Sequence, residues 1–344
     1  MDSRRTDRSD VMGWKLTVGR LRDAWRDSSE DRTALATFPA GPPIFLGGTH
    51  RSGTTWVGSM LAEPGLWYLH EPFNPNKKIW KESFTYANPE SARPDVNLYV
   101  TALLAGKHRT TSLYRHTDHC LMPLRVFRPV IKRVLIKDPL ACLLAGYLAK
   151  KFEFRTRILF RHPAGFVSSV HRLGWPTGGF LKQFLQRPDL MRDHLEPYRE
   201  LMQRHQDRND IASAAVLHGV LNVVQWNQIQ QNSEIRWHRF EDLCEDPINQ
   251  FRMIFQELSL PYTPETEQRH RALCHGDAQN PTDYRTHSVA RNSQAMAESW
   301  KRQLNADQTA QIRSFWEQFD VDLYRSESEW SLDRSVTATI GLSS

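Results

Sequence analysis

The stretch between residues 43 and 61 has the residue types and spacing of a phosphate-binding loop. Pro43–Gly48 has the pattern of a strand that enters a turn, and Thr54–Leu61 has the pattern of a helix. A loop between a strand and a helix presents backbone N–H groups and a helix N-terminus, which together favour an anion. Gly48 and Gly53 have the spacing of the two P-loop glycines. We therefore expect this stretch to bind a phosphate or a related anion.

The loop lacks the lysine that follows the second glycine in nucleoside-triphosphate P-loops. Thr54 stands at that position, and the cation lies inside the loop at Arg51. Because that lysine normally neutralises charge between the β- and γ-phosphates, its absence argues against an ATPase or a kinase. The hydroxyls of Ser52, Thr54 and Thr55 lie beside Arg51 in the chain. They favour an anion site over a plain strand–helix turn.

Polar triplets follow three later apolar runs. The triplets are His70-Glu71-Pro72, Lys137-Asp138-Pro139 and Arg161-His162-Pro163. Ligands of open α/β sheets lie beyond the carboxyl ends of the strands. We therefore expect the triplets and the phosphate loop to line one edge of a sheet.

The elements that position these residues alternate along the chain. Short apolar runs predict strands at Ile44–Gly47, Leu66–Leu69, Val134–Ile136, Ile158–Phe160 and Ile235–Trp237. Helical patterns follow several of them, at Thr54–Leu61, Leu140–Lys151 and Ala164–Arg172. This alternation predicts an α/β fold, a P-loop-type parallel sheet flanked by helices in a single domain.

Composition divides the chain into three parts. Residues 1–38 are a polar extension, residues 39–330 hold the main domain, and residues 331–344 are a C-terminal tail. One helical face in the extension is formed by Val11, Trp14, Val18, Leu21 and Trp25. We expect this helix to dock on the main domain, with a membrane-surface or dimer contact as the alternatives. The segment Lys107–Arg133 carries seven Lys/Arg and one acid, and we expect an insertion between strands there.

Charge and cysteine content restrict the class of protein. The net charge of +6 over 344 residues favours an anionic ligand, without separating a nucleotide, a nucleic acid, a sulfated glycan or an acidic membrane. The four cysteines lie far apart and form no Cys-x-x-Cys pair, which argues against a zinc site and a disulfide framework. No secretory signal and no apolar run of membrane-spanning length is present. We expect a cytoplasmic protein without a transmembrane segment, with peripheral membrane contact left open.

Two elements resemble sulfotransferases that use 3′-phosphoadenosine 5′-phosphosulfate (PAPS). Arg51-Ser52-Gly53-Thr54-Thr55-Trp56 resembles the loop of that family that binds the 5′-phosphosulfate. Arg161 ends a predicted strand, and Ser169 follows eight residues later, at the spacing of the family's 3′-phosphate element. The resemblance covers roughly residues 43–324, and it is most specific at these two elements.

Two weaker matches extend the resemblance toward the C-terminus. Trp237–Leu243 with Asp246-Pro247 is similar to the family's Arg-Tyr-Glu-Asp-Leu strand and turn. Arg291-Asn292-Ser293 with Trp300-Lys301 is similar to a segment of carbohydrate sulfotransferases that closes over the nucleotide. The resemblance therefore implies PAPS as the co-substrate, Arg291 and Ser293 as further nucleotide contacts, and no metal.

The resemblance also indicates the base that accepts the proton of the acceptor hydroxyl. The cytosolic branch uses a histidine in a Lys-x-His strand end, and the equivalent stretch here reads Lys137-Asp138-Pro139. The carbohydrate branch uses a glutamate before proline, and Glu71-Pro72 matches it. We therefore expect Glu71 to be the general base, with Arg51 and Lys137 as catalytic cations. His70, Asp138 and His50 are the competing bases.

The acceptor is expected to be a glycan, a glycolipid or a secondary metabolite that carries a hydroxyl. Trp67, Trp80 and Trp175 lie near the predicted edge and could stack on sugar rings, although aromatic residues at strand ends are also ordinary core. The main alternative is a P-loop kinase that acts on a small-molecule hydroxyl. A nucleic-acid-binding protein and a non-catalytic scaffold are weaker alternatives, since no nucleic-acid motif is present. A homodimer is left open.

Overall fold

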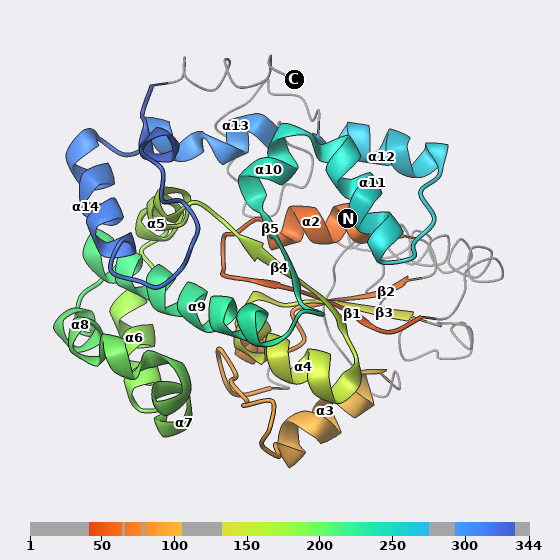
Figure 1. Ribbon diagram of the computed structural model, residues 1–344, viewed down its shortest axis with the longest axis horizontal. Coiled ribbons are helices and arrows are strands. Elements are labelled where there is room, and N and C mark those ends of the chain that lie inside the picture. Colours follow the sequence, from red (N-terminus) through yellow and green to blue (C-terminus); the bar gives the residue numbers. More distant parts are fainter. Residues whose placement is uncertain (1–40, 64–65, 78–79, 105–132, 275–292, 334–344) are drawn as a thin grey trace, which may run out of the picture.

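A five-stranded parallel sheet forms the centre of the molecule (Figure 1). The computed structural model describes residues 41–63, 66–77, 80–104, 133–274 and 293–333. The strands are β1 (Ile44–Gly48), β2 (Leu66–His70), β3 (Arg133–Lys137), β4 (Arg155–Phe160) and β5 (Arg236–Arg239). Their order across the sheet is β2-β3-β1-β4-β5, and each neighbouring pair is parallel. The predicted fold class and the five predicted strands are confirmed.

Helices cover both faces of the sheet. The α-helices are α2 (Thr54–Leu61), α3 (Pro94–Leu104), α4 (Ala145–Phe152), α5 (Pro163–Arg172), α6 (Thr177–Leu185), α7 (Pro188–Leu190), α8 (Arg199–His205), α9 (Ile211–Gln231), α10 (Phe240–Glu245), α11 (Pro247–Glu257), α12 (Pro264–Cys274), α13 (Ser293–Ala297) and α14 (Ala306–Trp316). Short 3₁₀ helices span Pro75–Lys77, Pro139–Leu144, Glu196–Tyr198, Ser299–Arg302 and Glu327–Trp330, and Met191–Leu195 is π-helical.

The alternation of side chains along β1 divides the core between the two faces. Ile44 and Leu46 pack in one apolar cluster with residues of α2, α11 and α12, which lie on one side of the sheet in Figure 1. Phe45 points into the other cluster, which includes α4, α5 and α9. Because a buried central strand presents apolar side chains to both faces, its sequence is a continuous apolar run.

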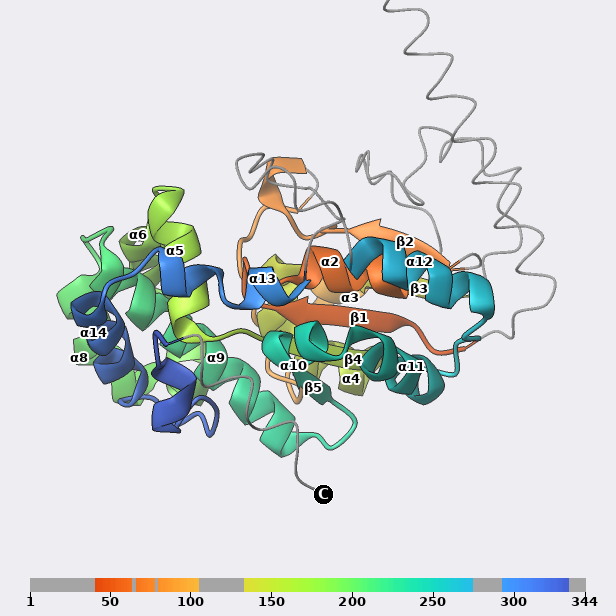
Figure 2. The same ribbon diagram turned by 90° about the horizontal axis from the view of Figure 1, so that it is seen from above.

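The helices α5, α6, α8 and α14 gather beyond the end of the sheet where β4 runs into α5 (Figures 1 and 2). The longest of the neighbouring helices, α9, begins at a capping box in which Asp210 accepts from the Ser213 N–H at 2.8 Å. It is apolar on most of its surface and is buried along most of its length, as expected of a helix enclosed by neighbours. This cluster extends the domain past the carboxyl ends of the strands.

Two details differ from the sequence expectations. The predicted helix at Leu140–Lys151 begins as a 3₁₀ helix over Pro139–Leu144, and Oδ1 of Asp138 caps its start by accepting from the Leu140 N–H at 2.8 Å. Arg133 does not belong to an insertion, since it is the first residue of β3 and is buried. Its guanidinium donates to the carbonyls of Pro42 and Leu258, both at 2.6 Å.

Other expectations fall on parts of the chain that are not described. The proposed helix in residues 1–38 and the rest of the basic segment, residues 107–132, lie outside the described residues. In the described ranges no helix has the length and apolar character to cross a bilayer. Buried Trp330, at the end of the predicted main domain, donates its indole N–H to the Tyr324 carbonyl at 2.9 Å. The division into 1–38, 39–330 and 331–344 stays a prediction.

Candidate active site

The phosphate loop is a tight turn between β1 and α2 that two glycines make sterically allowed. Gly48 has a φ of 138°, and a Cβ there would lie 2.5 Å from the Leu159 carbonyl oxygen. Gly53 has a φ of 98°, and a Cβ there would lie 2.4 Å from the ring of Phe240. Ser52 closes the turn, since its N–H and its hydroxyl both donate to the Thr49 carbonyl, at 3.2 and 2.6 Å. Any residue with a side chain would be strained at either glycine.

Arg51 joins the loop to the second predicted phosphate element. It has a left-handed backbone, with a φ of 63°, and its Nε donates to the Ser169 hydroxyl on α5 at 2.9 Å. The Arg161 guanidinium donates to the Arg51 carbonyl. The two elements are more than a hundred residues apart in the chain, and the structure brings them into direct contact.

Arg161 directly follows β4 and contacts two further groups. Its Nη2 donates to the Met296 carbonyl on α13 at 3.3 Å. Its guanidinium carbon lies 5.0 Å from the centre of the Phe240 ring, a cation–π arrangement. These contacts hold the guanidinium between the phosphate loop and α13.

Glu71 and Lys137 form an ion pair at the ends of β2 and β3. The Glu71 N–H donates to the Lys137 carbonyl at 2.7 Å, and Lys137 Nζ lies 2.6 Å from Glu71 Oε1. Asn74 donates to the second carboxylate oxygen at 2.9 Å. The Lys137 side chain is 1% exposed, so Lys137 is not a surface lysine. Glu71 has a φ of 51°, a conformation that residues other than glycine adopt mainly where the surroundings enforce it.

The surroundings set opposite pKa shifts on the two neighbouring carboxyl groups. Burial alone would raise the pKa of Glu71, but the charges of Lys137 and His70 hold it well below its usual value. Burial, with the charge of Glu71, raises the pKa of Asp138 to about 7. Glu71 is therefore a carboxylate at neutral pH.

The three competing bases are less available to a substrate than Glu71. Both oxygens of Asp138 accept backbone N–H groups, from Phe73 at 2.6 Å and Leu140 at 2.8 Å, and Asp138 is 0% exposed. The His70 side chain is 7% exposed, against 19% for Glu71. His50 packs edge-on against aromatic rings, and burial lowers its pKa to about 4.

The remaining loop residues contribute in different ways. Thr54 is buried at the start of α2, and Thr55 accepts through its carbonyl from the Ser59 hydroxyl at 3.0 Å. Trp56 is 5% exposed, and its ring packs edge-on against Phe240 and a second phenylalanine. A direct contact of this ring with a nucleotide would therefore need the core to open.

The two C-terminal candidates are only partly described. Arg291 lies outside the described residues. Ser293 is the first residue of α13, the helix whose Met296 carbonyl accepts from Arg161. The backbone of α13 therefore lies at the site, and the roles of Arg291 and Ser293 stay predictions.

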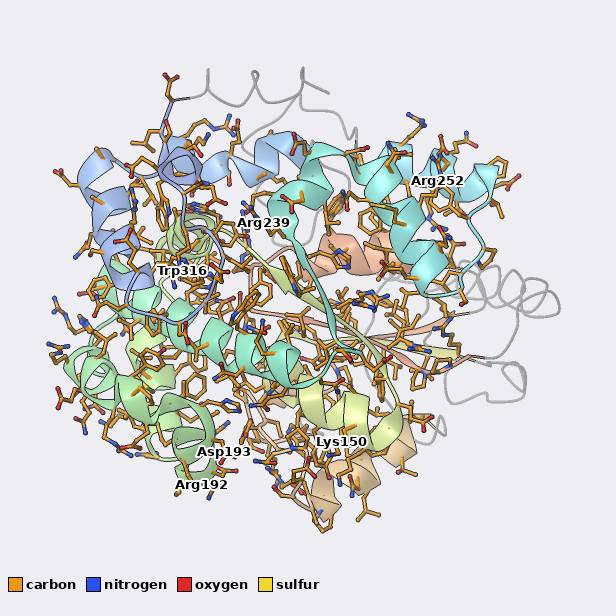
Figure 3. All side chains as sticks on the ribbon, in the orientation of Figure 1. Lys150, Arg192, Asp193, Arg239, Arg252 and Trp316 are labelled. Carbon is orange, nitrogen blue, oxygen red and sulfur yellow. The ribbon has the colours of Figure 1, made fainter. Side chains whose placement is uncertain are left out.

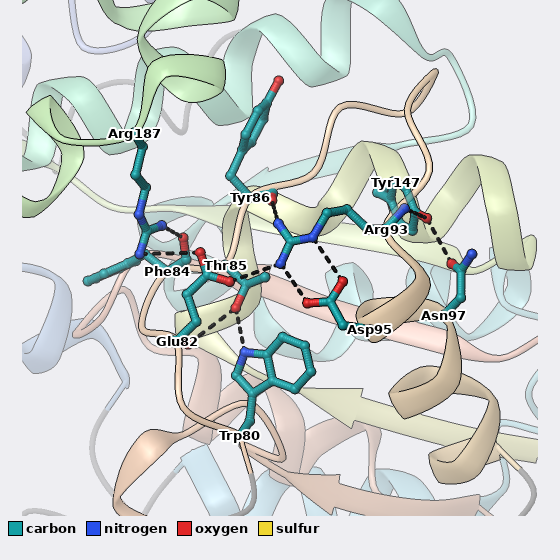
Figure 4. Close-up of polar contacts among 10 residues, drawn as sticks. All are labelled: Trp80, Glu82, Phe84, Thr85, Tyr86, Arg93, Asp95, Asn97, Tyr147 and Arg187. Carbon is teal, nitrogen blue, oxygen red and sulfur yellow. Dashed lines mark hydrogen bonds and ion pairs between the residues drawn. The ribbon is translucent and has the colours of Figure 1, made fainter.

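The loop of residues 80–86, whose polar contacts Figure 4 shows, borders the site through Phe84. Arg187 donates to the carbonyls of Ser83 and Phe84, at 2.7 Å to Ser83. Phe84 has a φ of 51°, and its ring lies edge-on to His50 with 5.2 Å between centres. Arg93 donates to the Tyr86 carbonyl at 2.7 Å. Two arginines from different elements thus hold the backbone of this loop.

The three tryptophans proposed near the acceptor have different surroundings. Trp80 donates to the Thr85 hydroxyl at 2.7 Å (Figure 4). Its ring packs on Phe73 and another core aromatic ring. The Trp175 ring lies edge-on to His50 with 4.9 Å between centres. Only the backbone of Trp67, in β2, is described. Of the two tryptophans whose side chains are described, Trp175 is the one that contacts a residue of the phosphate loop, His50.

The described residues hold no group of three or more metal-binding side chains placed around one point. A cavity of about 450 Å³ is lined by residues of α11, α12 and the turn between them, including Arg252 (Figure 3). None of the predicted site residues lines it. It is therefore separate from the arrangement at the carboxyl ends of the strands.

A family model described as "Sulfotransferase family" matches residues 42–264, more than half of the chain. The chain belongs to the sulfotransferase family. No curated protein matches its sequence. The match includes the phosphate loop, the Glu71–Lys137 pair and the Arg161–Ser169 element.

Solved structures of sulfotransferases share only low sequence identity with this family member. Mouse sulfotransferase SULT7A1 complexed with PAP is 13% identical, with 88% of this chain and 92% of that chain covered and a TM-score of 0.41. The sulfotransferase domain of the Synechococcus PCC 7002 olefin synthase is 18% identical, with 83% and 97% covered and a TM-score of 0.41. Sulfotransferase STF9 from Mycobacterium avium is 14% identical, with 88% and 85% covered and a TM-score of 0.40.

Proposed function

We propose that this sulfotransferase moves the sulfuryl group of PAPS to a hydroxyl of a carbohydrate, glycolipid or natural-product acceptor. The observation that supports it most is the order of the strand ends. Since β1 lies between β3 and β4, the phosphate loop lies between the Glu71–Lys137 pair and Arg161. An anion bound in the loop would have the Glu71 carboxylate on one side and the Arg161 guanidinium, a second group that can bind an anion, on the other.

The hydrogen-bond donors and cations of the site suit the anionic groups of PAPS. The loop from Arg51 to Thr55 supplies a guanidinium, hydroxyls and the N-terminus of α2 for the 5′-phosphosulfate. Arg161 and Ser169 would bind the 3′-phosphate, where a guanidinium and a hydroxyl suit phosphate oxygens. The Ser169 hydroxyl donates or accepts as required, so it can bond a phosphate in place of Arg51.

The proposed reaction is an in-line displacement at sulfur. The acceptor oxygen forms a bond to sulfur as the bond from sulfur to the 5′-phosphate oxygen breaks, and 3′-phosphoadenosine 5′-phosphate (PAP) leaves. Glu71 takes the proton of the acceptor hydroxyl, and Arg51 and Lys137 stabilise the charge on the leaving oxygen. No step in this scheme requires a metal ion.

The ion pair of Glu71 with Lys137 would make the basicity of Glu71 depend on donor binding. While Lys137 bonds Glu71, the pKa of the carboxyl group is low and the carboxylate is a weak base. A bound phosphosulfate would share the Lys137 ammonium, and the basicity of Glu71 would then rise. The base would become effective only when the donor is in place.

The acceptor class rests on the glutamate base and on the aromatic rings beside it. The rings of His50 and Trp175 pack edge to face at the phosphate loop, and aromatic side chains of this kind can pack against a sugar or another ring. A cytoplasmic location, peripheral membrane contact and a homodimer stay predictions.

Incubation with radiolabelled PAPS and a pool of acceptors tests the proposed function. We expect label on a hydroxyl of one acceptor class with the wild type, and background label with Glu71→Gln. Arg155→Ala is the control for a substitution remote from the site and should keep the label, since Arg155 lies at the opposite end of β4 and pairs with exposed Glu234 at 2.8 Å. Transfer from ATP in place of PAPS would contradict the proposal.

A further inference from the structure

The peptide unit between Arg161 and His162 is held from both sides. Glu241 Oε1 on α10 accepts from the His162 N–H at 3.0 Å. The His218 Nε2 on α9 lies 3.1 Å from the Arg161 carbonyl oxygen and must donate to it, because a carbonyl only accepts. The N–H and the carbonyl belong to one planar unit, so two hydrogen bonds from opposite sides fix its orientation. This orientation sets the direction in which the Arg161 side chain leaves the backbone.

One aromatic ring contacts both phosphate elements. The Phe240 ring occupies the space that a Cβ at Gly53 would enter, and it lies 5.0 Å from the Arg161 guanidinium carbon. It also packs edge-on against Trp56, with 5.9 Å between centres. Since Phe240 precedes Glu241, one turn at the end of β5 supports the phosphate loop, the Arg161 guanidinium and the Arg161–His162 peptide.

Tyr324, near the C-terminal end of the described residues, holds the second carboxylate oxygen of Glu241. The Tyr324 hydroxyl donates to Glu241 Oε2 at 2.7 Å; Tyr324 is buried and Glu241 is half-buried. The guanidinium of Arg239, labelled in Figure 3, lies 4.6 Å from the centre of the Tyr324 ring and pairs with Glu329 at 2.6 Å. The His162 ring stacks on Trp300 with 4.7 Å between centres and 1° between planes. Each group of this set is fixed by a neighbour in the same set.

We propose that Phe240, Glu241 and His218 are positioning residues that aim the Arg161 guanidinium at the 3′-phosphate of the donor. Glu241 and His218 act through the backbone of Arg161, and Phe240 packs against its guanidinium. The inference rests on the proposed function, in which Arg161 binds the 3′-phosphate. It assigns roles to a half-buried glutamate and a buried histidine that the sulfuryl transfer step does not use.

The readout that separates positioning from general stability is the preference for the 3′-phosphate. This preference is the ratio of the dissociation constant of adenosine 5′-phosphate to that of PAP, measured by calorimetry. General damage to the site weakens both ligands together and leaves the ratio unchanged. Misplacing Arg161 weakens PAP alone, because adenosine 5′-phosphate has no 3′-phosphate.

Three variants test the three contacts separately. Glu241→Ala removes the acceptor of the His162 N–H. His218→Phe removes the donor to Arg161 and keeps a ring to stack on Phe166, which lies 4.3 Å from it between centres. Phe240→Leu removes the ring beneath the guanidinium. We expect each to lower the ratio about tenfold, the loss expected of one buried hydrogen bond or cation–π contact.

Two further variants act as controls. Glu241→Gln keeps a side-chain oxygen for the His162 N–H and should retain most of the wild-type ratio. Gln228→Ala removes a buried side chain that donates to the Leu143 carbonyl at 2.8 Å and accepts from the Gly146 N–H at 3.1 Å. It should lower the melting temperature without changing the ratio.

The outcomes distinguish the inference from the proposed function. The inference holds if the ratio falls in the folded members of the first three variants and is retained in Glu241→Gln and Gln228→Ala. If the wild type prefers PAP and the folded variants keep that preference, or if Gln228→Ala loses it equally, the positioning role is wrong and the donor assignment stands. If the wild type has no preference for PAP, the donor assignment is wrong and the inference falls with it.

Discussion

The two sides of the phosphate loop hold their cations in different ways. On the β4 side, Arg51 bonds the Ser169 hydroxyl and Arg161 bonds backbone carbonyls. On the β3 side, Lys137 bonds the carboxylate of Glu71 at 2.6 Å. Hydroxyls and carbonyls orient a guanidinium without cancelling its charge, whereas a carboxylate neutralises an ammonium. The cations on the β4 side are therefore ready to bind an anion. On the β3 side, Lys137 must first leave the Glu71 carboxylate.

The largest expected effect comes from removing the base on the β3 side. Glu71→Gln should lower kcat by about 10²–10⁴-fold, as expected for the loss of a general base. Binding of PAP should change little, because the 3′-phosphate site on the β4 side is untouched. Steady-state kinetics with calorimetry on the same samples measures both. An active Glu71→Gln enzyme would show that the proton goes elsewhere.

The next effect tests the ion pair itself. Lys137→Met should lower kcat by about 10²–10³-fold through loss of charge stabilisation. It should also raise the pKa of Glu71, because burial remains and the main opposing charge is gone. The acid limb of the profile of kcat/KM against pH, which reports the free enzyme, should then move to higher pH. An unchanged acid limb would mean that the Lys137 charge does not control Glu71.

A smaller effect concerns the pH dependence of folding stability, which has opposite signs for a buried group on each of the two sides. On the β4 side, burial lowers the pKa of His218 to about 3 from 6.5. On the β3 side, burial raises the pKa of Asp138 to about 7 from 3.8. The stability that depends on neutral His218 is present above pH 6.5 and is lost as pH falls toward 3. The stability that depends on protonated Asp138 is present below pH 3.8 and is lost as pH rises through 7.

Denaturant unfolding at two pH values measures the His218 contribution. Between pH 6.5 and 5 the wild type should lose about 2 kcal/mol more than His218→Phe, at about 1.4 kcal/mol per pH unit for one proton, because the other histidines whose pKa burial lowers contribute equally to both proteins. Gln228→Ala should keep this additional loss. Equal pH dependence in the wild type and His218→Phe would mean that His218 is protonated in the folded protein.

The sequence alone was sufficient to predict the strands and the order of the candidate site residues along the chain. Apolar runs locate strands because buried parallel strands are apolar on both faces, and turn residues mark where each strand ends. The loop Gly48–Gly53 and the Arg161–Ser169 spacing are local features that depend on residues close in the chain. The strand order β2-β3-β1-β4-β5 depends on long-range packing, which a local pattern does not encode.

The side-chain partners could not be read from the sequence for the same reason. Asp138 follows Lys137 directly, yet its carboxylate caps two backbone turns while Lys137 reaches Glu71 on the neighbouring strand. Glu241 lies eighty residues after Arg161 in the chain, and only the fold shows that it holds the next peptide unit. The left-handed backbone at Arg51 and Glu71 is likewise imposed by the surroundings and not by the residue type.

Calorimetry of PAP against ATP, each with and without magnesium, tests the central claim most directly. The account predicts that PAP binds the wild type tightly without metal, that Arg161→Ala weakens it by about tenfold or more, and that Arg155→Ala does not. If only magnesium–ATP binds, or if Arg161→Ala binds PAP as the wild type does, the β4 side is not the 3′-phosphate site and the account is contradicted.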